Sequence, residues 1–125
     1  MLHDWSKLEA VALQEVQRII SDLPAPLQHR AQGVAVSLEA RPGPVRGEDG
    51  IEPDTMGLFV GPDFADQELC VLPEPPEIIL FIENIWDQVG ADDQLFREEV
   101  RTTYLHELGH YLGLNEDELF ERGLE

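Results

Sequence analysis

The sequence predicts an α+β domain, because a helical pattern is followed by a group of short apolar strands and then by further helical patterns. Leu8, Val16 and Ile19 recur at helical spacing near the N-terminus, whereas residues 78–82 form a continuous apolar run typical of a buried strand. The chain has 125 residues, enough for one modest hydrophobic core and too few for two. We therefore expect a single domain over residues 1–125.

The first helix is predicted from about Ser6 to the proline-rich segment that begins at Pro24. Ser6 with Glu9 matches a capping box, although Asp4 could be the N-cap instead. Pro24 and Pro26 end the pattern, because proline cannot continue a helix. We interpret this helix as a structural cover for a sheet, and its apolar stripe consists of Leu8, Val11 or Ala12, Val16, Ile19 and Ile20.

Short strands are predicted in the middle of the chain, where apolar residues gather between segments rich in proline and glycine. Gly33 opens the first strand, in which Val34, Val36 and Leu38 share one face. Further strands are expected at residues 57–61 and 78–82, with an additional candidate at residues 68–72.

Two connecting segments complete the middle of the chain. Residues 41–56 are rich in proline, glycine and acidic residues, and we predict a mobile loop there, with a functional rim as the alternative. Residues 84–89 are predicted to form a helical turn before Gly90.

The last long helix, of about 20 residues, carries the most informative pattern in the chain. His106, Glu107 and His110 form the pattern His-Glu-x-x-His. Residues four apart on a helix differ by ~40° around its axis, so both imidazoles can hold one ion. Glu107 leaves the helix at a neighbouring angle, from which a carboxylate can take a proton from a metal-bound water. Asp92 with Asp93 offers the N-cap, and Gly113 offers the C-terminal stop.

Two histidines at this spacing could instead be polar residues on a solvated face. The surrounding pattern argues against that interpretation, because apolar residues lie around much of the helix circumference and predict a buried, central helix. Paired histidines on a buried helix cost solvation free energy unless they bind something. We therefore expect a metal site. The apolar positions are Phe96, Val100, Leu105, Leu108 and Leu112.

A third ligand is expected after the helix. Glu116 lies ten residues after His106, at the spacing of the third ligand in extended motifs of this kind. Asp117 is the alternative, although its shorter side chain more naturally caps a following helix through Leu119 and Phe120. Two histidines and one carboxylate make a three-ligand catalytic zinc site with one position left for water.

Residues 106–119, HELGHYLGLNEDEL, resemble the small bacterial zincin-like metallopeptidases, also called minimal zincins. The resemblance is close from about Asp92 to Phe120 and rests on the order of elements before that. It implies a cytoplasmic α+β domain, with a small mixed sheet packed on an N-terminal helix and a central active-site helix. It also implies a bound zinc ion (Zn2+) and an acidic residue at the position of Glu116. The expected metal ligands are therefore His106, His110 and Glu116, and the expected catalytic base is Glu107.

The chain departs from the larger zincins in three respects. The third position of the motif holds Glu116 where metzincins have histidine, and both methionines precede the motif, so there is no Met-turn. Only 12 residues follow Gly113, which leaves no room for a second subdomain. No residue is an obvious donor to a developing oxyanion. Tyr111 is the nearest candidate, with a packed aromatic side chain as the alternative.

Two further expectations concern the surroundings of the motif. Glu99 and Thr103 share the angular face of His106, where each could hydrogen-bond a ligand imidazole or simply be solvated. In zincins an extended substrate pairs with an edge strand beside the cleft, and residues 57–61 are the candidate strand here.

The composition of the chain also limits which functions are possible. The chain has 8 Lys and Arg against 26 Asp and Glu, a net charge of −18, which disfavours binding to nucleic acids and anionic membranes. Cys70 is the single cysteine, so no intramolecular disulfide is possible. With no signal peptide and no apolar run long enough to span a bilayer, we expect a cytoplasmic protein.

These observations favour a zinc metallopeptidase that acts on a peptide or protein substrate. One alternative is a zinc-binding accessory module without catalytic activity, because the second subdomain of larger zincins is missing. Another is a metal-dependent ribonuclease, since some RNA-maturation hydrolases space their ligands in the same way. Glu107, Glu116 and the negative charge argue against the ribonuclease, because an RNA groove needs cationic residues.

Overall fold

The computed structural model describes residues 5–48, 50–61, 75–114 and 118. A helix pair comes first, then strands interrupted by a short helix, then two further helices, in agreement with the α+β class. The helices are α1 (Trp5–Asp22), α2 (Ala25–Ala31), α3 (Pro44–Glu48), α5 (Ile82–Gln88) and α6 (Asp93–Leu112), and the strands are β1 (Ala35–Glu39), β2 (Gly57–Val60) and β3 (Glu77–Phe81).

The described strands form one small mixed sheet in the order β1-β3-β2. β1 runs parallel to β3, and β2 runs antiparallel to it. The apolar run from Ile78 to Phe81 is fully buried because β3 is the central strand, with a neighbour on each side. β2 therefore lies at an edge of the sheet, as the candidate substrate strand was expected to do.

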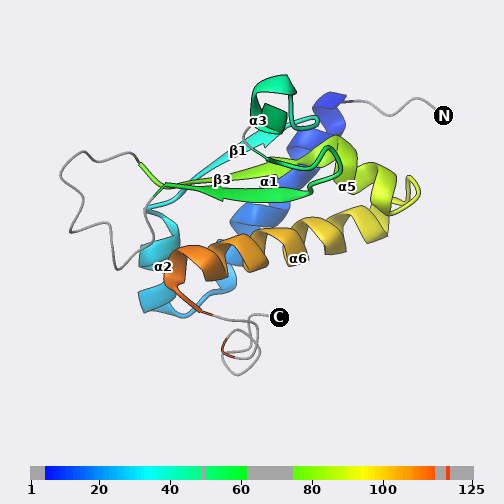
Figure 1. Ribbon diagram of the computed structural model, residues 1–125. Coiled ribbons are helices and arrows are strands. Elements are labelled where there is room, and N and C mark those ends of the chain that lie inside the picture. The colour runs from blue at the N-terminus through cyan, green and yellow to red at the C-terminus, as the bar shows by residue number, and fades with distance from the viewer. Residues whose placement is uncertain (1–4, 49, 62–74, 115–117, 119–125) are drawn as a thin grey trace.

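The two long helices and the sheet enclose the hydrophobic core. In Figure 1 the sheet lies above α6, and α1 passes behind. α6 contacts α1, β2 and β3, so it occupies the middle of the domain. Side chains from all three parts meet in one cluster, which includes Leu8, Ala12, Val16 and Ile19 of α1, Ile78 and Leu80 of β3, and Val100, Tyr104 and Leu108 of α6.

The start and the end of the first helical segment differ from the sequence prediction. Ser6 lies inside α1, which begins at Trp5, so the predicted capping box is wrong; Asp4, the alternative cap, lies outside the described residues. Pro24 and Pro26 do more than end α1, because they also begin α2. Proline suits a first helical turn, where its missing N–H would have no partner within the helix.

The segment before β2, predicted as a mobile loop, contains the short helix α3. Both guanidinium groups of the segment are paired. Arg46 donates to both carboxylate oxygens of Glu39, and Nε of Arg41 donates to Glu83 at 2.9 Å. These hydrogen bonds hold the connection against β1 and α5.

The boundary between β3 and α5 lies one residue earlier than predicted. Ile82 is the first residue of α5, and the predicted turn over residues 84–89 is the later part of this helix. The candidate strand at residues 68–72 lies outside the described residues.

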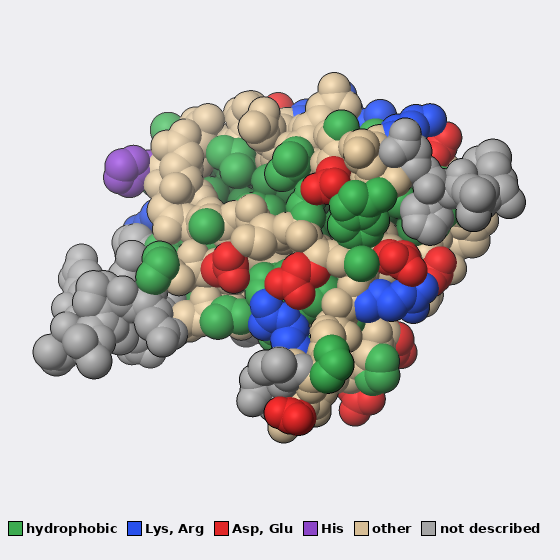
Figure 2. All heavy atoms as spheres, turned by 90° about the horizontal axis from the view of Figure 1, so that it is seen from above, with side chains coloured by type: hydrophobic (Ala, Val, Ile, Leu, Met, Phe, Trp, Pro, Cys, Tyr) green, Lys and Arg blue, Asp and Glu red, His purple; other side chains and the backbone are tan. Residues whose placement is uncertain are grey.

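Some acidic side chains on the surface are paired with the few basic ones. Figure 2 views the molecule from above, and basic side chains on this face lie directly beside acidic ones. The pairs include Arg41 with Asp87 and Arg46 with Glu39, whose closest atoms are 2.5 and 2.8 Å apart. No helix among the described residues is long and apolar enough to cross a membrane.

Candidate metal site

The candidate site lies in the last two turns of α6, and its position depends on how this helix begins and ends. The carboxylate of Asp92 accepts a hydrogen bond of 2.9 Å from the N–H of Leu95, which confirms the predicted N-cap. Gly113 has φ 73°, in the left-handed region that glycine adopts at low cost, and its N–H returns to the last turn of the helix. The predicted stop is also confirmed.

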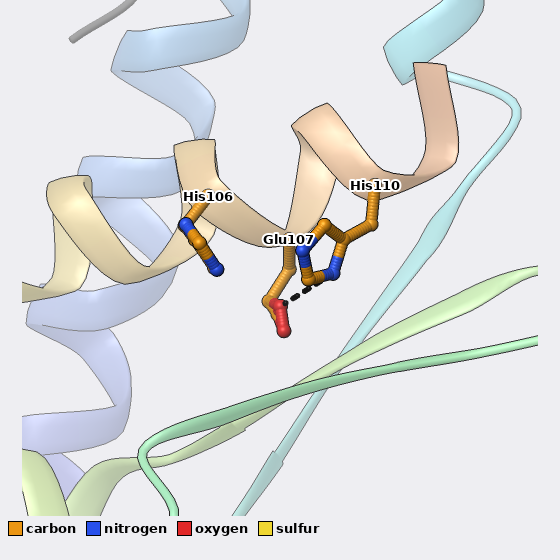
Figure 3. A group of neighbouring side chains, drawn as sticks. All are labelled: His106, Glu107 and His110. Carbon is orange, nitrogen blue, oxygen red and sulfur yellow. Dashed lines mark ion pairs between the residues drawn. The ribbon is translucent and has the colours of Figure 1, made fainter. Parts of the chain in front are cut away.

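His106, Glu107 and His110 extend from α6 toward the strands, with Glu107 between the two imidazoles (Figure 3). The imidazole centroids lie 4.7 Å apart. One potential ligand atom from each of the three residues lies within 4.8 Å of the other two. Two nitrogens that bind the same zinc ion can be at most ~4.2 Å apart, since each Zn–N bond is about 2.1 Å. Rotation of the exposed imidazoles can bring their two nitrogens within this distance.

Burial is distributed differently from the sequence prediction. His106 and His110 are exposed, whereas Glu107 is only 6% exposed. The expectation of a buried central helix therefore fails at the two histidines, because one face of the C-terminal half of α6 is open to solvent. Exposed histidines carry little desolvation cost, so burial gives no reason for them to bind a metal. The buried carboxylate is the group that needs a partner.

Glu107 has an unusual electrostatic environment. Burial raises the pKa of its carboxyl group, and the positive charges available to His110 and His106 oppose that rise. Its Oε2 atom is buried and accepts no hydrogen bond from the described residues; Nδ1 of His110 is 3.5 Å away. A buried oxygen without a hydrogen bond is uncommon, and a polar ligand between the imidazoles would satisfy it. The donor set and this oxygen together fit a zinc ion with a water molecule beside Glu107.

The strand side of the site is formed by β2. A Cβ atom built on Gly57 would lie 2.5 Å from Cγ2 of Thr103 and 3.2 Å from Cγ of Glu107. The backbone of β2 therefore touches α6 directly beneath the motif. Sequence reasoning did not single out Gly57, although a glycine within an apolar strand is a known sign of close backbone approach.

Three residues near the motif have roles that the structure clarifies. Thr103 is buried, and its methyl group faces Gly57, so the residue packs against β2 and is not solvated. Glu99 is half-buried on the same helix. Tyr111 is buried, with its ring centroid 5.8 Å from that of Phe59, and its hydroxyl lies close to Gly33. The packed aromatic alternative accounts for Tyr111.

Several predicted residues lie outside this picture. Glu116 and Asp117, the candidates for the third ligand, are outside the described residues, as are His3 and Cys70. His29 is exposed on α2.

Comparison with known proteins adds one finding to the geometry. The sequence profile of the zincin-like metallopeptidases matches residues 31–124. The matched segment contains the whole described sheet and α6 with its motif. The comparison with curated proteins finds no match.

Proposed function

Because the chain belongs to the zincin-like metallopeptidase family, we propose that it is a zinc-dependent hydrolase that cleaves peptide bonds. The observation that carries this proposal is the arrangement on α6, where two exposed imidazoles flank one buried carboxylate. A structural helix has no need of such a group. A metal-dependent hydrolase does require this arrangement, since the imidazoles bind the metal and the carboxylate accepts and donates protons.

His106 and His110 are the proposed histidine ligands of zinc, and Glu116 is the proposed third ligand. Support for Glu116 comes from its position ten residues after His106 and from the turn at Gly113, which ends the helix before it. Zinc bound by these residues supplies a Lewis acid that polarises the substrate carbonyl and makes water more acidic.

Glu107 is the proposed catalytic base. Its carboxylate accepts a proton from the attacking water and later returns it to the leaving amine. Oε2 of Glu107 accepts no hydrogen bond from the described residues, which supports this role, because an oxygen already engaged in a hydrogen bond within the protein is a poorer proton acceptor.

The edge of β2 that faces away from β3 is the proposed binding surface for an extended peptide, since no other strand of the described residues pairs with it. The N–H of Phe81 donates to the carbonyl of Met56, so in this antiparallel ladder Leu58 and Val60 also bond to β3. Gly57 and Phe59 then direct their N–H and C=O groups away from β3. A peptide paired with these groups would pass beside Glu107, since Gly57 contacts that side chain. The net charge of −18 favours a peptide over a nucleic acid.

The test is hydrolysis of an unstructured protein such as casein, and of a mixed fluorogenic peptide library. The zinc-loaded wild type should be active, and removal of zinc by a chelator should abolish the activity. Glu107→Gln should retain zinc and fold but lose at least ~100-fold in rate, because an amide cannot accept the proton. Glu98→Gln is the matched control, since Glu98 is an exposed residue of the same helix, and it should keep full activity.

The remaining outcomes separate the alternatives. A zinc-loaded wild type that hydrolyses none of these substrates favours an accessory module. Cleavage of RNA without cleavage of peptides favours a ribonuclease. Full peptidase activity in Glu107→Gln would show that another group is the base.

A further inference from the structure

We propose that Gly57 is a positioning residue for Glu107. Because Gly57 has no side chain, β2 comes close enough to pack against the aliphatic part of the Glu107 side chain. The backbone of β2 then holds the carboxylate between His106 and His110. This inference rests on the proposed role of Glu107 as the catalytic base.

The first line of evidence is the tightness of the contact. A Cβ atom on Gly57 would come within 2.5 Å of Cγ2 of Thr103, a distance that real Cβ atoms essentially never show. It would also lie 3.2 Å from Cγ and 3.8 Å from Cδ of Glu107. At this point β2 and α6 have room for a hydrogen atom and for nothing larger, so any side chain must displace one of the two elements.

The second line of evidence is that β2 is anchored and cannot easily move away. Its residues pair with β3 from Gly57 to Val60. Asn84 of α5 is only 6% exposed. It fixes the segment just before the strand, because its amide donates to the carbonyls of Pro53 at 2.7 Å and Thr55 at 2.9 Å. A larger residue at position 57 would therefore push α6 and the side chain of Glu107.

The third line of evidence is that packing is what holds the Glu107 carboxylate. Among the described residues no hydrogen bond reaches Oε2, and the 3.5 Å approach of His110 is too long to fix a rotamer. A flexible glutamate keeps a productive geometry only when neighbouring groups restrict its rotamers. Gly57 lies against the aliphatic part of the Glu107 side chain, so β2 supplies that restriction.

The experiment compares the wild type with Gly57→Ala, Thr103→Ser and the double variant. Serine lacks Cγ2, the atom that the new methyl group would meet first, so Thr103→Ser should relieve most of the collision. Gly47→Ala is the matched control, because a Cβ on Gly47 meets nothing within 4 Å. The readouts are zinc content, the rate of peptide hydrolysis, and the 13C resonance of the Glu107 carboxyl group in the zinc-free protein. That resonance is identified by its absence in Glu107→Gln.

Gly57→Ala should shift the Glu107 resonance and lower the rate by about 10-fold or more, since a misplacement of about 1 Å can cost ~10²-fold. Zinc content should not change, because both histidine ligands lie on α6. The double variant should recover the resonance and most of the rate, whereas Thr103→Ser and Gly47→Ala should resemble the wild type.

The proposal is overturned if Gly57→Ala folds with an unchanged Glu107 resonance, or if Thr103→Ser fails to restore the resonance. Should Gly57→Ala not fold, the double variant decides: a folded double variant with the wild-type Glu107 resonance supports the proposal, and a folded double variant with a shifted resonance overturns it. If the wild type hydrolyses no peptide, the proposed function fails, and the resonance still decides the positioning role.

Discussion

Nδ1 of His110 lies 3.5 Å from Oε2 of Glu107, so an exposed imidazole and a buried carboxylate meet within one turn of α6. This relationship gives the site two sides. The histidines face solvent, from which a metal ion and a substrate can approach. Glu107 lies on the protein side under β2, where water is scarce and a carboxylate is a stronger base.

Zinc stoichiometry tests the ligand assignment. We expect one zinc ion per chain, because among the described residues one cluster has ligand atoms close enough together. His106→Ala and His110→Ala should each lose stoichiometric zinc, since either change removes one of the two histidine ligands. The control His29→Ala changes an exposed histidine on α2 and should retain zinc. Metal analysis of the purified variants provides the measurement, and full zinc in both site variants would contradict the assignment.

The third ligand can be tested by comparing two neighbouring acids. Glu116→Ala should weaken zinc binding by ~10-fold or more, because it leaves two protein ligands. Asp117→Ala is the matched control and should cost only about 1 kcal/mol of stability, the typical effect of losing a helix cap. Calorimetric titration with zinc distinguishes them. Affinity lost in Asp117→Ala and kept in Glu116→Ala would reverse the assignment.

Asn84 should contribute more to stability than the ion pairs around it. Asn84→Ala leaves the carbonyls of Pro53 and Thr55 without their donor, and we expect a loss of about 1–3 kcal/mol in the free energy of unfolding. Asn84→Asp should be at least as harmful, because a carboxylate cannot donate to either carbonyl. Arg41→Ala is the comparison and should cost less, since its partners Glu83 and Asp87 remain hydrated, and Asn84, whose Oδ1 also accepts from Arg41, keeps the two bonds that it donates. Urea denaturation of the three variants measures the loss in the free energy of unfolding for each.

We predict that the hydroxyl group of Tyr104 destabilises the fold. The residue is fully buried, its hydroxyl makes no hydrogen bond with the described residues, and burial raises its pKa to about 12. Tyr104→Phe removes the unsatisfied group while keeping the ring, so we expect the free energy of unfolding to rise by about 1 kcal/mol. Thermal and urea denaturation can measure this change. A loss of stability would show that the hydroxyl has a partner.

The sequence by itself determined α6 and the spacing of its motif. The cap at Asp92, the stop at Gly113 and the approach of His106 to His110 depend on residues within a few positions of one another. Such local features follow from helix geometry alone. The coarse order of a helix, then strands, then helices was also predictable, because it follows from the period of apolar residues. The short helices α2 and α3 were not predicted.

Which groups of the motif are buried, and which residues lie against them, depends on the tertiary structure. His106 and His110 are exposed, whereas Glu107 is buried next to β2. The contact between Gly57 and Glu107 joins residues fifty positions apart. This contact requires that β2 pairs with β3 and that Asn84 anchors the segment before β2. Neither interaction is encoded by local periodicity in the sequence. Long-range packing therefore places the carboxylate, whereas local helix geometry places the imidazoles.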